Sequence, residues 1–267
     1  MQHNFSMKYL VIFLALGLLA CNGEKAGEQP DPNLTHEKKL LQDVRQYPDS
    51  ALLVENLVQF YRENDEYEKA LAGVDKALQK DSAAPRFWHI KGILHYENAD
   101  TLQAIKALET SNRLLTNMND VLLLSKLYAE TRNPLSLQLA DLLIKQGQFT
   151  KESMLIKGIY YKSIADDEKA LALFDEAIIA GYTFVEAYKE KALLLYTKGE
   201  YMEALRVLDK AVKIQSSYAE GYYYMGQCFE KLNRLEDAKE SYETALIYDS
   251  EYEEASQALT KVSGLLK

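Results

Sequence analysis

The sequence predicts an all-α solenoid built from about six pairs of helices. The main indication is a small residue that returns at a fixed interval, at Ala70, Ala104, Ala170, Ala204 and Ala238, where the step from Ala104 to Ala170 is close to two intervals. A fixed period of about 34 residues is typical of helical repeat arrays. The chain also contains only 12 glycines and 5 prolines in 267 residues, which favours long helices over a many-stranded sheet.

Composition and motifs exclude several functions. The net charge is −9 at pH 7, and an acidic protein repels phosphate backbones, so nucleic acid is not expected as a partner. Cys21 and Cys228 are far apart, and His89 and His95 face different sides of one predicted helix, so neither a disulfide nor a metal site is expected. We expect Cys228 to be a small buried side chain. With no glycine-rich phosphate loop, HExxH motif or nucleophile elbow, the sequence predicts no cofactor and no enzyme.

The amino terminus has the pattern of a secretory signal. Lys8 precedes twelve largely apolar residues, 9–20, and Cys21 follows them. As a helix these twelve residues span about 18 Å, too short for a bilayer core but suitable for a signal peptide. The run Leu18-Leu19-Ala20-Cys21 resembles the lipobox of bacterial lipoproteins, although Leu19 stands where a small residue is more usual.

The lipobox resemblance implies cleavage after residue 20 and lipidation of Cys21. The alternative is a plain cleaved signal or a hydrophobic start without this role, and Met7 is an alternative initiator to Met1. Residues 21–33 are polar, with glycine and proline, and predict a flexible tether with a reach of roughly 20 Å. The folded body, 34–267, is therefore expected close to a membrane surface.

The body divides into blocks that each predict two helices joined by a polar turn. The first helix of a block carries bulky residues at positions 4 and 11, which share one helical face. The second helix carries the periodic alanine at position 20 and a large apolar residue at position 24. Because bulky side chains hold helices apart, we expect the small residue at position 8 to face the alanine at position 20. The blocks cover about 51–84, 85–118, 119–150, 151–184, 185–218 and 219–252.

These blocks resemble the tetratricopeptide repeat (TPR), whose pattern places W, L, G, Y, A, F, A and P in this order. The block with Trp88, Gly92, Ala104 and Leu108 matches well, as does the block 219–252. Other residues replace the late proline, and the third block lacks the central alanine, so we expect an altered helix pair and a bend there. The resemblance covers about 200 residues and implies a right-handed superhelix.

Flanking segments complete the predicted solenoid. Residues 35–46 predict an amphipathic helix with Thr35 as its N-cap. Residues 253–267 predict a terminal helix with one polar side, which a solenoid needs to cover its exposed core.

The TPR resemblance implies that partners bind in a concave groove lined by positions 2, 5, 9, 12 and 13 of the first helices. These positions mix aromatic, aliphatic and singly charged residues, which suits a peptide or a helix. They lack the ordered Lys, Asn and Arg set with which some TPR proteins clamp a C-terminal carboxylate, so that partner is not expected. The predicted groove residues are Arg62, Arg86, His89, Ile93, Tyr96, Ile159, Lys162, Lys189, Leu193, Tyr196, Tyr223 and Gln227.

Together these features predict a lipid-anchored scaffold or adaptor that binds a protein or peptide on the extracytoplasmic side of a bacterial envelope. An outer-membrane location is favoured over the inner membrane, and the oligomeric state stays open. The alternative is a lipoprotein that captures a small molecule or glycan for an uptake system. That function would use Tyr96, Tyr196 and Tyr223 as stacking platforms.

Overall fold

The computed structural model describes residues 32–266, and within this range it contains fourteen α-helices. Six helix pairs with one flanking helix at each end confirm the predicted all-α solenoid. The predicted signal peptide 1–20 and the lipidation site Cys21 lie outside the described residues. The helices are α1 (Pro32–Gln46), α2 (Ala51–Glu63), α3 (Tyr67–Lys80), α4 (Pro85–Glu97), α5 (Thr101–Leu114), α6 (Met118–Glu130), α7 (Leu135–Lys145), α8 (Thr150–Ser163), α9 (Asp167–Ala180), α10 (Val185–Thr197), α11 (Tyr201–Ile214), α12 (Ala219–Lys231), α13 (Leu235–Tyr248) and α14 (Glu253–Leu265).

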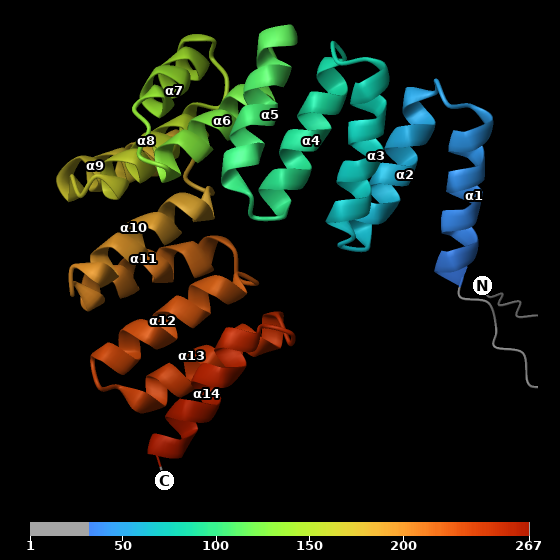
Figure 1. The fold of residues 1–267 in the computed structure, drawn as a ribbon. Helices are drawn as coiled ribbons and strands as arrows, with labels where there is room; N and C mark the ends of the chain where they lie inside the picture. The colour runs from blue at the N-terminus through green and yellow to red at the C-terminus, as the bar shows by residue number, and fades with distance from the viewer. Residues whose placement is uncertain (1–31, 267) are drawn as a thin grey trace, which may run out of the picture.

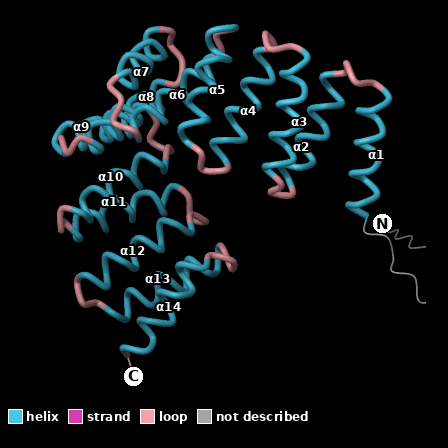
Figure 2. The backbone as a smooth tube through the Cα atoms, viewed as in Figure 1, coloured by secondary structure: helices cyan, strands magenta, loops and turns pink. Residues whose placement is uncertain are grey.

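The described helices follow a curved path (Figure 1). One row runs from α1 to α5, the chain turns around α6–α9, and a second row continues from α10 to α14. Short loops join consecutive helices throughout (Figure 2). Each pair packs most extensively within itself and then against the next pair, as expected of a repeat array in which stacking completes the core.

The first helix begins earlier than the sequence indicated. Helix α1 starts at Pro32, so Thr35 lies inside the helix and the prediction of an N-cap at Thr35 is wrong. Proline is favoured at the first position of a helix because its missing N–H would have no intrahelical partner there. Residues 32 and 33, assigned to the tether, therefore belong to the helical body.

The periodic alanines lie on the buried side of the second helix in each of the five regular pairs. All five, from Ala70 to Ala238, have no exposed surface. Their burial follows from close helix packing, which leaves no room at the crossing for a larger side chain.

We expected the glycines at position 8 to face these alanines, and this prediction is wrong. They face the large residue at position 24 instead. A Cβ added at Gly158 would lie 2.4 Å from the ring of Phe174, and one added at Gly226 would lie 2.4 Å from the ring of Tyr242. Where the first helix instead carries Ala192, the residue at position 24 is the smaller Leu208 in the same core cluster. Position 8 meets position 24 in the same way where that residue is aliphatic, since a Cβ added at Gly92 would lie 2.6 Å from Leu108.

Ala204→Leu tests the assigned crossing. Ala204 is completely buried, and added methylene groups in a packed core force neighbouring side chains and backbone to move. We expect the free energy of unfolding to fall by about 1–3 kcal/mol in a denaturant titration. An unchanged midpoint would mean that Ala204 does not lie at the crossing.

The turns within the pairs share one backbone conformation. Residue 15 of five blocks has a positive φ, and only Gly199 among them is a glycine. In each turn the following N–H donates back to the carbonyl of position 11, as in Glu66 N to Tyr61 O at 2.8 Å. This is the six-to-one bond of a Schellman motif, and it gives the pairs one common turn geometry. The other residues in this conformation are Asp65, Ala99, Ala165 and Asn233.

The third pair departs from the others, as predicted. Helix α7 has 11 residues, whereas the second helices of the other pairs have 14. Val121, Leu124, Ser125 and Tyr128 are buried on α6, the first helix of this pair. With α7 short, α6 packs directly on α8 more extensively than other consecutive first helices pack on each other. The path of the chain turns in this region (Figure 1).

Both ends of the described array are covered by a flanking helix. Leu40, Leu41 and Val44 of α1 pack on the first core cluster. Ala255 and Val262 of α14 are buried, while its opposite side is polar and exposed, which confirms the predicted capping helix.

Candidate partner-binding face

The twelve predicted groove residues all lie on the first helices of the pairs, α2, α4, α8, α10 and α12. We call the surface formed by α2, α4, α6, α8, α10 and α12 the first-helix face. Arg86 is exposed on it, and the other eleven side chains are partly buried. Charged and polar side chains connect neighbouring helices across this face.

Two arginines join α2 to α4. Arg86 binds the carboxylate of Glu55, and Arg62 makes a two-point contact with the carboxylate of Glu97, with its Nε 2.6 Å from Oε2. Arg62 also donates to Gln59 Oε1 at 3.3 Å. Contact with Glu97 raises the pKa of Arg62 above its usual value. Both guanidinium groups are thus already neutralised by carboxylates of the neighbouring repeat.

His89 joins α4 to α6 through a fully buried carboxylate. Its Nδ1 lies 2.5 Å from Oδ1 of Asp120, whose side chain has no exposed surface. Ser111 donates to the other carboxylate oxygen at 2.7 Å. The hydrogen bond to Asp120 raises the pKa of His89 above its usual value of 6.5, despite the opposing effect of burial. The carboxylate thereby favours the charged form of the imidazole, which compensates the buried charge.

Two lysines make the corresponding links in the second half of the array. Lys162 of α8 binds the carboxylate of Glu190 on α10. Lys189 of α10 donates to both oxygens of Glu220 on α12, at 3.1 Å each. All five cationic residues predicted for the groove are therefore paired with a carboxylate of the adjacent first helix.

The aliphatic residues of the predicted set remain available between these charges. Ile93, Ile159 and Leu193 occupy position 9 of their helices and are partly buried. Ile93 lines a pocket, described below, and Ile159 packs beside the core residue Phe174. They supply the apolar contact area that peptide recognition requires.

The three predicted tyrosine platforms are held by neighbouring side chains. The ammonium of Lys126 lies 5.2 Å from the ring centroid of Tyr96 and donates to its hydroxyl at 2.7 Å. Tyr196 meets Tyr201 edge to face, with ring centroids 5.3 Å apart. Burial raises the pKa of Tyr196 above its usual value.

Tyr223 lies in a cluster of rings near the carboxyl-terminal end of the face. Its ring centroid is 5.1 Å from that of Tyr252, 5.2 Å from Tyr224 and 5.8 Å from Tyr242. Gln227, also predicted for the groove, donates to the Tyr223 hydroxyl at 2.7 Å. The structure therefore brings Tyr223 and Gln227 together, although Tyr223 has a large part in packing.

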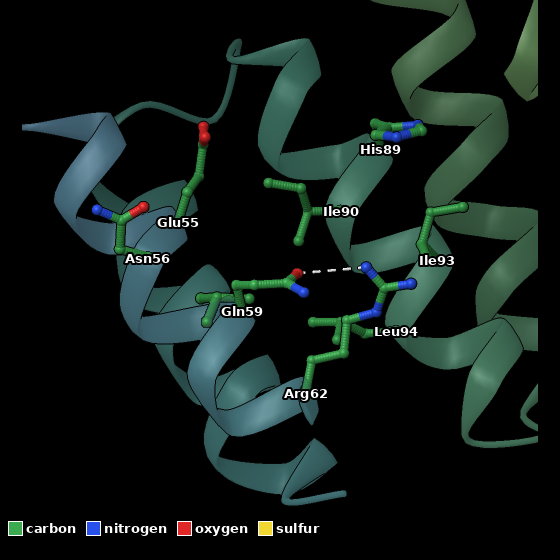
Figure 3. A pocket seen from close by; sticks show the side chains of 9 residues that line it. Glu55, Asn56, Gln59, Arg62, His89, Ile90, Ile93 and Leu94 are labelled. Carbon is green, nitrogen blue, oxygen red and sulfur yellow. Dashed lines mark hydrogen bonds between the residues drawn. The ribbon is translucent and has the colours of Figure 1, made fainter. Parts of the chain in front are cut away.

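A pocket of about 290 Å³ opens on the first-helix face between α2 and α4. Glu55 and Gln59 line it from α2, and Ile90 and Ile93 line it from α4, where Ile90 points toward α2 (Figure 3). Of the predicted groove residues it gathers Arg62, His89 and Ile93.

The acidic partners of the cations were missed at the sequence level. Glu97, Asp120, Glu190 and Glu220 each follow a predicted cation on the next first helix. A sequence signal does exist, because position 5 of one repeat pairs with position 2 of the next. The two positions are 31 residues apart in Glu55 with Arg86, His89 with Asp120, and Lys189 with Glu220.

A second set of charge pairs links three of the first helices, α4, α8 and α10, to the preceding second helix. Lys91 lies 2.6 Å from Asp75, Lys157 lies 2.8 Å from Asp141, and Lys191 lies 2.5 Å from Asp175. The two members of each pair have the same separation in sequence, so one contact recurs between successive repeats. Because these pairs are partly exposed, each stabilises the stack by at most about 1 kcal/mol.

Residues 32–266 contain no group of three or more His, Cys, Asp or Glu side chains that could hold a metal ion. None of the helices in this range combines the length and apolarity that crossing a bilayer requires. Cys228 is buried as predicted, and burial raises the pKa of its thiol to about 12, so the thiolate is strongly disfavoured at neutral pH.

Sequence comparison identifies the repeats. Profiles described as TPR repeat and tetratricopeptide repeat match residues 192–233 and 219–252. The chain is 23% identical over 208 residues to stress-induced-phosphoprotein 1 of Caenorhabditis elegans, covering 76% of this chain and 64% of that protein. It is 29% identical over 91 residues to the general transcriptional corepressor trfA of Dictyostelium discoideum, covering 34% of this chain and 6% of the corepressor. The chain thus spans less than two thirds of either relative.

Solved structures show the same fold. A tetratricopeptide repeat protein from Parabacteroides merdae superposes with a TM-score of 0.72 at 18% identity, over 86% of this chain and 92% of that one. PilW, a type IV pilus biogenesis factor, superposes with a TM-score of 0.60 at 16% identity, over 78% and 97% of the two chains. Residues 192–252 therefore match the tetratricopeptide repeat, and the described residues have the fold of a TPR solenoid. This fold is a scaffold of the kind that binds protein or peptide partners and is typically not enzymatic.

Proposed function

We propose that this protein is a membrane-anchored, extracytoplasmic scaffold that binds a protein or peptide segment along its first-helix face. The observation that carries the proposal is the composition of that face. Partly buried aliphatic side chains such as Ile93 and Leu193 lie between charges that are already paired. Such a face offers apolar contact area without uncompensated cations, and a peptide can lie along several repeats at once.

The anchoring part of the proposal rests on the lipobox-like run that ends at Cys21. Several acyl chains on one cysteine bind a membrane firmly, at about 0.8 kcal/mol per buried CH₂ group. We assign the protein to assembly in a bacterial envelope, with the outer membrane as its site. PilW, a type IV pilus biogenesis factor, has a similar fold.

The packing of the tyrosines favours a peptide over a glycan. Glycan capture requires open ring faces, but Tyr223 packs among Tyr224, Tyr242 and Tyr252, and the hydroxyl of Tyr96 is already bound by Lys126. Peptide binding needs no single free ring. We therefore retain the peptide-binding scaffold as the proposed function.

Photo-crosslinking in cells tests the binding part. A photoreactive amino acid at Tyr196 or Gln227 is expected to trap one dominant envelope protein, because both positions lie on the first-helix face. The matched control is Glu176, an exposed position on the second helix α9. Equal trapping from Glu176, or no adduct from either face position, would contradict the proposal.

Cys21→Ser tests the anchor. The variant is expected to lose labelling by a palmitate analogue and to leave the membrane fraction, whereas Cys228→Ser is expected to keep both. Labelling that persists in Cys21→Ser would refute lipidation at this residue, and it would leave the binding proposal to the crosslinking result.

A further inference from the structure

The outer side of helix α1 is a basic surface. Helix α1 is the outermost helix at one end of the described array (Figure 1). Lys38, Lys39, Gln42 and Arg45 are all exposed, and they share one side of the helix because residues three and four positions apart lie on the same face. We call these four residues the basic outer face. Within residues 32–266, none of its three cations forms an ion pair with a carboxylate.

The acidic residues of α1 do not neutralise this face. Glu37 lies on the core side, where it accepts a hydrogen bond from the Tyr61 hydroxyl at 2.8 Å and lies 3.6 Å from the ammonium of Lys69. Asp43, the other carboxylate of the helix, is partly buried and forms no ion pair within the described part of the chain. The apolar residues of α1 pack on the first core cluster, so the helix is held with its basic outer face toward solvent.

The place of α1 in the chain indicates which surface meets this face. Pro32, the first residue of α1, follows Cys21 by eleven positions, and eleven residues span at most about 40 Å. Helix α1 has 15 residues, which corresponds to a length of about 22 Å. A membrane that holds Cys21 is therefore within reach of the whole helix, and the short link keeps the two at a high effective concentration.

The charge of the protein favours the same assignment. The net charge of −9 repels an anionic surface from most of the molecule. Lysine and arginine side chains beside a membrane are attracted to anionic lipids over about 10 Å at 0.1 M salt. An acidic partner protein would meet the same three cations, but the anchor delivers only the membrane to α1.

We propose that the basic outer face of α1 lies on the phosphate headgroups of anionic phospholipids in the membrane that holds the anchor. This inference rests on the proposed function, because it requires lipidation at Cys21. The contact involves the end helix alone, so it leaves the first-helix face open to the partner protein. It also defines which end of the array meets the membrane.

Fluorescence quenching in vesicles tests the contact. The full chain, purified from host membranes with its lipid anchor, carries a fluorescent amino acid at Gln42 and is reconstituted with lipids whose headgroups bear a quencher. Quenching is expected to be several-fold stronger in vesicles of phosphatidylglycerol and phosphatidylcholine in equal parts than in phosphatidylcholine alone. The same probe at Gln257, exposed on α14 at the other end of the array, is expected to show no difference. Equal quenching at Gln42 in the two kinds of vesicle, as a face covered by an acidic protein would give, would overturn the inference.

Two charge-matched variants separate a local contact from the effect of net charge. The triple variant Lys38→Gln, Lys39→Gln and Arg45→Gln is expected to lose the lipid-dependent quenching at Gln42. The control replaces three exposed lysines of α3, α5 and α11 with glutamine, which changes the net charge by the same amount, and is expected to keep the quenching. Equal loss in both variants would refute a contact made by α1. The control residues are Lys76, Lys106 and Lys210.

The salt dependence keeps this inference distinguishable from the proposed function. Raising the salt from 0.1 M to 1 M shortens the screening length from about 10 Å to about 3 Å. We expect this change to abolish the quenching at Gln42 while the anchored protein stays with the vesicles. Anchored protein without lipid-dependent quenching would remove only the contact of α1, whereas release of the protein from the vesicles would contradict the anchor and with it this inference.

Discussion

Gly158→Ala is expected to lower the free energy of unfolding by about 1 kcal/mol, although alanine is the better helix former. The new Cβ would lie 2.4 Å from Cε1 and 2.6 Å from Cδ1 of the Phe174 ring, which is completely buried. Overpacking of this kind costs about 1–3 kcal/mol, and the gain in helix propensity of about 1 kcal/mol offsets only part of it. Denaturant unfolding of the two proteins measures the difference.

A double-mutant cycle isolates the contact between positions 8 and 24. In the background of Phe174→Leu, Gly158→Ala recreates the native combination of Ala192 and Leu208, so we expect it to be neutral or stabilising there. The two substitutions should therefore couple by about 2 kcal/mol. Gly264→Ala is the matched control because a Cβ added on that part of α14 meets no atom within 4 Å. Additive effects would show that Gly158 and Phe174 do not share volume.

The fold was predictable because one requirement repeats. Every pair needs a small residue where its helices cross, so the same residue type returns once in each regular repeat and the helices can be placed from the alanines alone. Spacing identifies which residues share a helical face, but not which residue of the opposite helix each one meets. The side chains of a helix lean toward its amino terminus, so facing partners need not follow from position alone. For this reason the packing of Gly158 against Phe174 could be recognised only in the structure.

The first-helix face was predictable in position but not in its electrostatics. The repeat register located Arg62 and Lys189 on the face, and the structure places both there. Their carboxylate partners, Glu97 and Glu220, were missed because they belong to the next repeat. The sign of each pair also varies: position 5 is acidic in Glu55 and basic in Lys189, so no single residue type recurs.

His89→Ala is expected to have the largest effect among single substitutions on this face. It would leave the carboxylate of Asp120, which has no exposed surface, with Ser111 as its remaining side-chain donor. Removing one member of a buried ion pair costs about 3–5 kcal/mol, and we expect about 3 kcal/mol because the His89 side chain is 34% exposed and water can enter where it is removed. Urea unfolding at pH 6 measures the loss, and adding Asp120→Ala should restore part of it.

The same pair makes stability depend on pH in a defined direction. The pKa of His89 is higher in the folded protein than its usual 6.5, so the charged imidazole stabilises the fold fully below pH 6.5 and this stabilisation disappears as the pH rises through the folded value. The double variant His89→Ala with Asp120→Ala lacks both groups and serves as the reference. The stability of the wild type relative to this reference is expected to decrease between pH 6 and pH 9. A constant difference would mean that the His89 charge does not stabilise the contact between α4 of the second pair and α6 of the altered third pair.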